Sequence, residues 1–303
     1  FFLLIAADLG RGLCLLCLLC AKRRPTERFR RVGNRVNLAL LAAAAALAGC
    51  GIISGTSVPE VRHEEIALPG LPGELDGMTV AVLADLHIDS LARIGRVRAI
   101  VDRVAPLNPD LILLAGDFVD GRVAVRGGDL RPLEELSAPL GVFGVPGNHE
   151  YYSGYEEWML FLSGLGIDML ENSHRILAGG KLALGGVTDP AAARFGRETP
   201  DLRKTFDGAP PGAVKLLLAH QPKPAAEAAK SGVALQVSGH THGGMIVGID
   251  RLVARFNAGF VAGSYRVGDL RLYVSRGSGI WNGFPIRLGV PSEITLLRLK
   301  RQE

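Results

Sequence analysis

Two histidines spaced two apart are the first sign of chemistry in this 303-residue chain. His240 and His242 lie in the stretch Ser-Gly-His-Thr-His-Gly-Gly at 238–244. In extended backbone, residues two apart point to the same side. The flanking glycines permit a turn that would bring both imidazoles to one point. Such a pattern is typical of a metal site, provided that further ligands occur upstream.

Further residues of metal-ligating type follow short apolar runs in the chain. The runs at 78–84, 110–115, 140–145, 214–219 and 234–237 predict buried strands. Most end in polar residues, several of them in glycine-assisted turns, which is where open α/β sheets place their sites. With the histidine pair, the residues collected at these strand ends are Asp85, His87, Asp117, Asn148, His220, His240 and His242.

The size of this set predicts two divalent ions. Two carboxylates, one amide oxygen and four imidazoles are too many for one ion. A carboxylate such as Asp117 can bridge two ions roughly 3.5–4 Å apart, as in two-metal phosphoryl-transfer sites. Oxygen and nitrogen ligands without a thiolate favour Mn, Fe, Mg or Zn over copper or an iron–sulfur cluster, with Mn as our preferred candidate.

Other elements must position these side chains. Helical spacing is found at 94–104 and 155–165, weaker strands at 174–177 and 182–186, and alternating strands at 270–275 and 293–299. The stretch 188–212 is rich in proline, glycine and charge, and we interpret it as a loop or small cap over the site.

Charge and cysteine content separate residues 1–53 from the rest. This segment has eight basic and two acidic residues, whereas 54–303 has 26 basic and 28 acidic residues. The basic balance therefore gives no support for a nucleic-acid partner. All four cysteines, Cys14, Cys17, Cys20 and Cys50, lie in the segment. The first three have zinc-like spacing but only leucines between them, which favours lipid-facing or helix-packing cysteines.

The same segment predicts a membrane anchor. Apolar runs at 1–21 and 37–53 flank a basic loop at 22–35, which places the loop in the cytoplasm and the following domain outside. The second run ends Leu-Ala-Gly-Cys50, similar to a lipoprotein lipobox, so a lipidated Cys50 is an alternative anchor. The chain begins with Phe rather than Met, which leaves further upstream spans open. We expect an anchor at 1–53, a linker and entry to the domain at 54–77, and a catalytic domain at 78–303.

Five motifs in order resemble the calcineurin-like metallophosphoesterase superfamily over residues 78–300. They are Asp-x-His at 85–87, Gly-Asp-x-x-Asp at 116–120, Gly-Asn-His-Glu at 147–150, the lone His220, and Gly-His-Thr-His at 239–242. Stretches 148–154 (NHEYYSG) and 273–294 (YVSRGSGIWNGFPIRLGVPSEI) are similar to its membrane-anchored bacterial branch, which is itself similar to UDP-2,3-diacylglucosamine pyrophosphatases of lipid A biosynthesis. Met245 stands where that branch is expected to have glutamine.

This resemblance implies a fold and, together with the charge pattern, a cellular location. We expect an α/β four-layer αββα sandwich of two mixed sheets, preceded by transmembrane helices, with the metal site along one edge. The resemblance to a bacterial branch also implies the bacterial inner (plasma) membrane, and the charge asymmetry of residues 1–53 places the catalytic domain on its periplasmic or extracellular side. A UDP-linked lipid precursor would instead be met on the cytoplasmic leaflet. The sequence carries no signal for oligomeric state.

The resemblance also implies a role for each site residue. One ion would be held by Asp85, His87, Asp117 and His242, and the other by Asp117, Asn148, His220 and His240. A water bridging the ions would attack phosphorus in line. His149 would be the general acid, with Asp120 accepting its hydrogen bond, although an Asx-turn explains Asp120 as well.

The expected function is hydrolysis of a phosphodiester or pyrophosphate in a membrane lipid or lipid-linked substrate. A phosphomonoesterase, a protein phosphatase and an inactive binding module on the same scaffold are the alternatives. The remaining polar and aromatic residues of note have plainer interpretations, as solvated, turn-forming or packing groups: His63, His174, Asp189, Tyr151, Tyr152 and Trp281.

Overall fold

The computed structural model describes residues 2–22, 24, 26–281 and 283–302. It divides into two compact units, residues 1–53 and 54–303. The first unit holds α1 (Phe2–Cys20) and most of α2 (Glu27–Thr56). Among the described residues, α2 is the one helix long and apolar enough to cross a membrane. Phe1 and several side chains of α1 lie outside the described residues, so the predicted span at 1–21 stays a prediction.

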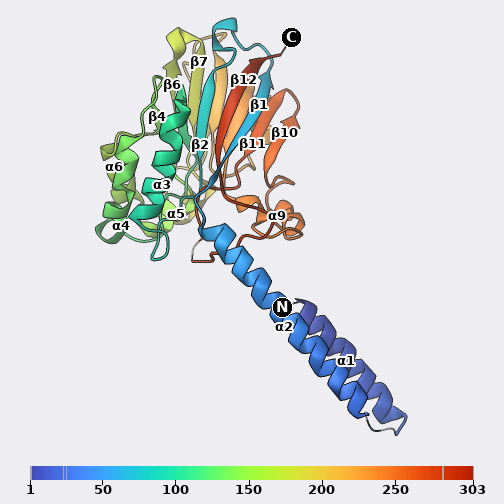
Figure 1. Cartoon of the computed structure of the whole chain (residues 1–303). Coiled ribbons are helices and arrows are strands. Elements are labelled where there is room, and N and C mark those ends of the chain that lie inside the picture. Colours follow the sequence, from blue (N-terminus) through green and yellow to red (C-terminus); the bar gives the residue numbers. More distant parts are fainter. Residues whose placement is uncertain (1, 23, 25, 282, 303) are drawn as a thin grey trace. The chain divides into compact units, whose positions relative to one another are not determined.

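The second unit contains two six-stranded sheets stacked face to face (Figure 1). The first sheet has the order β1 (Glu60–Leu68), β12 (Glu293–Arg301), β2 (Thr79–Leu83), β3 (Leu111–Leu114), β4 (Val142–Gly144) and β5 (Asp168–Met169). The second has the order β10 (Gly263–Val267), β11 (Leu270–Val274), β9 (Val233–Ser238), β8 (Val214–Leu218), β7 (Leu182–Gly186) and β6 (Ser173–Leu177).

Both sheets are mixed. In the first, β2, β3, β4 and β5 pair in parallel, and β12 runs antiparallel to β2. In the second, β7, β8, β9 and β11 pair in parallel, with an antiparallel strand at each edge. Parallel pairing sets the ends of the central strands along one edge of each sheet, where the polar turns follow.

The central strands are apolar throughout because both of their faces are covered. In β2, Val80 and Val82 pack between the sheets, whereas Ala81 and Leu83 face the helices. Helices α3 (Ile94–Val104), α4 (Val123–Leu130) and α6 (Tyr155–Gly164) cover the first sheet (Figure 1). Helices α7 (Leu202–Thr205) and α8 (Ala225–Lys230) pack on the second. The predicted four-layer αββα fold is confirmed.

Several elements differ from the sequence expectation. The segment predicted as a linker and entry to the domain, 54–77, contains β1, nine residues long, which pairs in parallel with β12. The strand lacks a recognisable apolar pattern because most of its residues are charged or partly exposed, and only Ile66 and Leu68 near its end are buried. Three helices were not predicted from the sequence. They are α4, α5 (Asn148–Ser153) and α9 (Asp250–Phe256), the last of which follows the histidine pair. The stretch 188–212 contains a 3-10 helix, Pro190–Phe195, and α7.

Candidate active site

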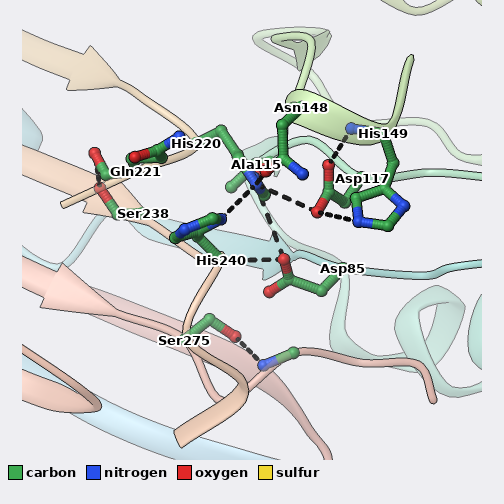
Figure 2. Close-up of polar contacts among 12 residues, drawn as sticks. Asp85, Ala115, Asp117, Asn148, His149, His220, Gln221, Ser238, His240 and Ser275 are labelled. Carbon is green, nitrogen blue, oxygen red and sulfur yellow. Dashed lines mark hydrogen bonds and ion pairs between the residues drawn. The ribbon is translucent and has the colours of Figure 1, made fainter. Parts of the chain in front are cut away.

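The predicted ligand residues lie at the carboxyl ends of strands from both sheets. Asp85 follows β2, Asp117 follows β3 and His220 follows β8. Asn148 begins α5 just after β4, and the histidine pair follows β9. Side chains from five strand ends therefore converge, as Figure 2 shows for most of them.

The backbone is unusual at this convergence. Five of the seven residues have a positive φ: Asp85 (52°), His87 (43°), Asp117 (54°), His240 (73°) and His242 (50°). Non-glycine residues are uncommon in this region, and such strain, about 1–3 kcal/mol each, tends to cluster at functional sites. The backbone thus marks these positions independently of their side-chain chemistry.

One cluster is formed by Asp85, His87 and His242, all buried. One potential ligand atom from each lies within 4.8 Å of the others. The Nε2 atoms of His87 and His242 are 3.1 Å apart. Two imidazoles and a carboxylate at this spacing could hold one divalent ion.

A second cluster is formed by Asp117, His220 and His240. His220 Nε2 lies 3.1 Å from Asn148 Oδ1 and 3.1 Å from His240 Nδ1. Asp117 joins the clusters, because its Oδ2 is 3.1 Å from His220 Nε2 and 3.5 Å from His87 Nε2. Figure 2 shows Asp117 between His220 and His149. A carboxylate in this position can bridge two ions.

The hydrogen bonds around the clusters suit metal binding. His220 Nδ1 lies 2.7 Å from the Ala115 carbonyl oxygen, and His87 Nδ1 lies 2.9 Å from Asp120 Oδ2. Each contact places the ring proton on Nδ1 and leaves the lone pair of Nε2 facing the cluster. Asp85 Oδ1 accepts from the His240 N–H, whereas Oδ2 is buried without a partner among the described residues. A bound cation would satisfy that oxygen.

In the absence of metal, electrostatics favour the ligating charge states of Asp117 and His240 but not that of His220. Burial lowers the pKa of His220, but the charges of Asp117 and Asp85 outweigh it and raise this pKa well above its usual range. Burial raises the pKa of Asp117, but the imidazoles of His220, His87 and His149 outweigh it and hold the pKa well below its usual range. Burial, reinforced by His220, lowers the pKa of His240 to about 3. A charged carboxylate beside a neutral imidazole is the form in which both can ligate a cation.

His149 and Asp120 lie beside the clusters. His149 Nδ1 is 2.5 Å from Asp120 Oδ1, and its backbone N–H donates to Asp117 Oδ1 at 2.9 Å. Burial lowers the pKa of His149, but its hydrogen bond to Asp120 and the charge of Asp117 outweigh this and raise it. Asp120 also contacts His87, a link that the sequence did not predict. One carboxylate therefore orients two rings.

Sequence reasoning gave no role to Glu150, although it is fully buried. Its carboxylate accepts hydrogen bonds from the backbone N–H groups of Asp117, Phe118 and Gly147, at 2.7–3.0 Å. It thus ties the turn after β3 to the start of α5. A glutamate three residues after a helix-capping position is the signal that could have identified it.

Arg287 was also missed. Its side chain is only 1% exposed and donates to four carbonyl groups, those of His242, Val290, Arg276 and Gly279. Its Nη2 also lies 3.3 Å from His242 Nδ1. The guanidinium therefore fixes the loop that carries His242, and nothing local in the sequence connects residues 45 positions apart.

A pocket of about 540 Å³ opens over the clusters. One end is polar and includes Asp117, Asn148, His149, His240 and His242. The wall beside it is apolar and is formed by Met245, Ile246, Ile249, Val253, Trp281 and Phe284. The pocket can therefore take a polar phosphoryl group together with an apolar moiety.

The residues given plainer interpretations lie largely away from this pocket. His63 is exposed on β1, and His174 Nδ1 bonds the Thr205 carbonyl at 2.7 Å. Asp189 caps a 3-10 helix by accepting from the Ala191 N–H. The remaining three are aromatic: Tyr151 is buried against Tyr155, Tyr152 has its ring 5.5 Å from His149, and Trp281 lines the pocket.

Comparison with known proteins agrees with this geometry. Residues 78–244 match the family model for calcineurin-like phosphoesterases. A transmembrane protein with a metallophosphoesterase domain from Danio rerio is 32% identical, over 99% of this chain and 70% of that protein. An uncharacterized metallophosphoesterase from Helicobacter pylori strain J99 is 35% identical, over 92% of this chain and 72% of that protein.

A crystal structure of a 5′-nucleotidase precursor from Thermus thermophilus aligns with a TM-score of 0.44 at 16% identity, covering 73% of this chain and 54% of that one. The family assignment does not depend on it, since the family model covers more than half of this chain and relatives align along most of it. The chain belongs to the calcineurin-like phosphoesterase family and is a metal-dependent phosphoester hydrolase.

Proposed function

We propose that this protein is a membrane-anchored phosphoesterase that uses two divalent ions to hydrolyse a phosphodiester or pyrophosphate bond in a lipid-linked substrate. A substrate similar to UDP-2,3-diacylglucosamine is our first candidate. The observation that carries the proposal is the position of Asp117, whose Oδ2 lies within 3.5 Å of imidazoles from both clusters.

The ligand sets follow from the two clusters. Asp117 is shared, and the others divide as Asp85, His87 and His242 for one ion, and Asn148, His220 and His240 for the other. When bound, two divalent ions, with Mn²⁺ preferred, neutralise phosphoryl oxygens and lower the pKa of a water molecule. The unpaired Oδ2 of Asp85 supports this assignment.

His149 is proposed as the general acid. Because Nδ1 of His149 is hydrogen-bonded to Asp120, Nε2 of the same ring is the atom that can donate a proton to the departing oxygen. His149 lines the pocket, and the raised pKa keeps its ring protonated at higher pH than an isolated histidine. Asp120 acts through His149 by fixing its orientation and charge.

A lipid-linked substrate is supported by the apolar wall and by α2. The wall joins the polar end of the same pocket, so one molecule can place a phosphoryl group and an acyl chain together. The Danio rerio relative is itself described as a transmembrane protein, and α2 is long enough to span. Anchoring raises the local concentration of a substrate in the same membrane.

We propose that the catalytic domain lies on the periplasmic side of a bacterial inner membrane. Seven basic residues and one acidic residue occupy 22–35, before the apolar part of α2. A reporter that folds only outside the cytoplasm, fused after the last residue, tests this. A periplasmic result would mean that the UDP-2,3-diacylglucosamine-like substrate is a lipid-linked phosphate of the outer leaflet. A cytoplasmic result would refute the proposed side and allow the UDP-linked precursor itself to be the substrate.

The function is tested on the full chain in detergent, stripped of metal by a chelator and reloaded with Mn²⁺. We expect two bound ions and hydrolysis of bis(p-nitrophenyl) phosphate that Asp117→Asn abolishes. His149→Ala should bind both ions but lose roughly 10²–10⁴-fold in turnover of an alkyl phosphodiester. The loss should be smaller for the p-nitrophenyl ester, whose leaving group needs less help from an acid. His63→Ala, exposed on β1, is the matched control.

The alternatives predict other outcomes. Faster turnover of p-nitrophenyl phosphate than of the diester would favour a phosphomonoesterase or protein phosphatase. Binding of two ions without turnover of either ester would favour a binding module. Failure to bind metal would refute the ligand assignment altogether.

A further inference from the structure

Exposed apolar side chains lie on the two chain segments that contribute to the apolar wall of the pocket. We call them the apolar rim: Val247, Ile249, Leu252, Phe256, Trp281 and Phe284, each between 39% and 70% exposed. Monomeric soluble domains rarely expose a contiguous apolar patch of this kind unless it binds something. The rim therefore needs a partner.

The rim is one surface although it comes from two chain segments. Residues 247–256 include α9, whereas Trp281 and Phe284 precede β12. The Val247 N–H donates to the Leu288 carbonyl at 3.0 Å, which ties the segments together. Ile249, Trp281 and Phe284 also line the pocket, so the rim continues into its apolar wall. Figure 1 shows α9 at the same end of the sheets as α5, whose first residue is Asn148.

The rim adjoins the point where the chain leaves its apolar helix. A Cβ on Gly55 would lie 2.1 Å from the carbonyl oxygen of Pro285, the residue after Phe284. The Arg96 guanidinium donates to the Thr56 carbonyl at 2.9 Å, and so fixes the same turn of chain to the domain. Ile53, at the end of the apolar run, is only two residues from Gly55, a reach of about 7 Å. The chain can therefore enter a bilayer within a few residues of the rim.

The charges beside the rim suit a lipid surface. Arg251 and Arg255 are exposed on α9, one turn apart, next to Leu252 and Phe256, which are also one turn apart. This helix thus carries an apolar row beside a basic row, the arrangement of helices that lie in a bilayer interface. Basic residues near an anionic bilayer are attracted to its headgroups. Trp281 is of the type enriched at headgroup depth.

We propose that the apolar rim lies in the interfacial layer of the bilayer that holds α2, with Arg251 and Arg255 against anionic headgroups. The pocket then opens onto lipid, and a lipid-borne group reaches the metal ligands along a continuous apolar wall. This last step rests on the proposed function, whereas the docking itself does not.

The chain contains a natural probe for this surface. It has two tryptophans, of which Trp158 is fully buried and Trp281 is 47% exposed on the rim. The full chain is reconstituted in nanodiscs of phosphatidylcholine and phosphatidylglycerol, with or without brominated acyl chains. We expect brominated lipid to quench the Trp281 emission at least two-fold and aqueous iodide to have little effect. Trp281→Phe should remove the quenching, because only Trp158 remains.

Matched variants separate docking from mere exposure. In the Trp281→Phe background, Leu160→Trp places a tryptophan on α6 at a site 78% exposed, where iodide should quench it and brominated lipid should not. Leu252→Glu with Phe256→Glu should at least halve the lipid quenching of Trp281. Arg251→Glu with Arg255→Glu should do so only in anionic discs.

Two outcomes would overturn the proposal. Quenching of Trp281 by iodide but not by brominated lipid would place the rim in water. Protection from both quenchers, with two chains per disc, would show that a second copy covers the rim. Neither reading depends on hydrolysis, so an inactive protein with a quenched Trp281 would refute the proposed function alone.

Discussion

Gly147 gives a sharp test of how tightly the site is built. It precedes α5 with φ −97° and ψ −175°, a conformation that alanine also adopts. A Cβ there would nevertheless lie 2.2 Å from Asp117 Oδ1 and 2.5 Å from the Asp117 nitrogen. The expected effect of Gly147→Ala is therefore due to close approach alone, without a change in backbone preference.

The size of the effect follows from these distances. Ordinary contact begins at 3.4 Å, so Asp117 and the start of α5 must separate by roughly 1 Å. A displacement of about 1 Å in a catalytic group costs about 10²-fold in rate. Overpacking of this kind lowers the free energy of unfolding by about 1–3 kcal/mol. Gly147→Ala should show both losses.

The assay is Mn²⁺-dependent hydrolysis of bis(p-nitrophenyl) phosphate, together with metal content and urea unfolding. Gly128→Ala is the matched control, because a Cβ at this position inside α4 meets nothing within 4 Å. The control should retain activity and gain about 0.5–1 kcal/mol of stability, since alanine favours a helix over glycine. Wild-type activity and stability in Gly147→Ala would refute the close approach to Asp117.

Three further predictions concern the residues that hold the site. Glu150→Gln should lower the free energy of unfolding by about 1–3 kcal/mol, because one amide oxygen cannot serve three buried N–H groups; thermal unfolding measures this, and an unchanged midpoint contradicts it. Arg287→Met should lower the free energy of unfolding in urea by about 3 kcal/mol, because it leaves buried carbonyl groups unpaired, including that of His242. A loss of activity with unchanged stability would disprove the structural role. Burial raises the pKa of Asp120, but hydrogen bonds from His149 and His87 outweigh it and lower the pKa to about 2. The Asp120 contribution is therefore present above about pH 4 and lost as the pH falls toward 2. Metal-free wild type should thus lose roughly 1–2 kcal/mol more stability over this range than Asp120→Asn; an equal loss in the two proteins would count against the assignment.

Much of the fold was predictable because its central strands are short apolar runs ended by polar turns. The strand predicted at 78–84 is β2, Thr79–Leu83, and the helix predicted at 94–104 is α3 with the same bounds. Apolar composition sufficed there because both strand faces are buried. The family assignment and the α/β sandwich are confirmed, whereas the roles of individual site residues remain predictions that the geometry supports.

Other elements depend on contacts distant in sequence. β1 is rich in charge and takes its hydrogen bonds from β12, more than 200 residues away. α4 contains Gly127 and Gly128, which weaken helix propensity by about 1 kcal/mol each. Gly127 is nevertheless buried, and a Cβ there would lie 3.0 Å from the Phe161 ring, so packing against α6 favours the helix. Local sequence cannot predict such elements, because partners supplied by the fold stabilise them.

The sequence by itself determined which residue types follow which strands, and hence the metal chemistry and the reaction class. Only the tertiary structure decided how these residues are held. The carboxylate of Asp120 contacts the rings of His87 and His149. Glu150 accepts hydrogen bonds from two separate turns, and Arg287 contacts the ring of His242. The tertiary structure also decided that the exposed Ile249, Trp281 and Phe284, which are far apart in sequence, line one pocket. The physical reason is that a motif records spacing along the chain, whereas hydrogen bonds and exposure depend on distances across it.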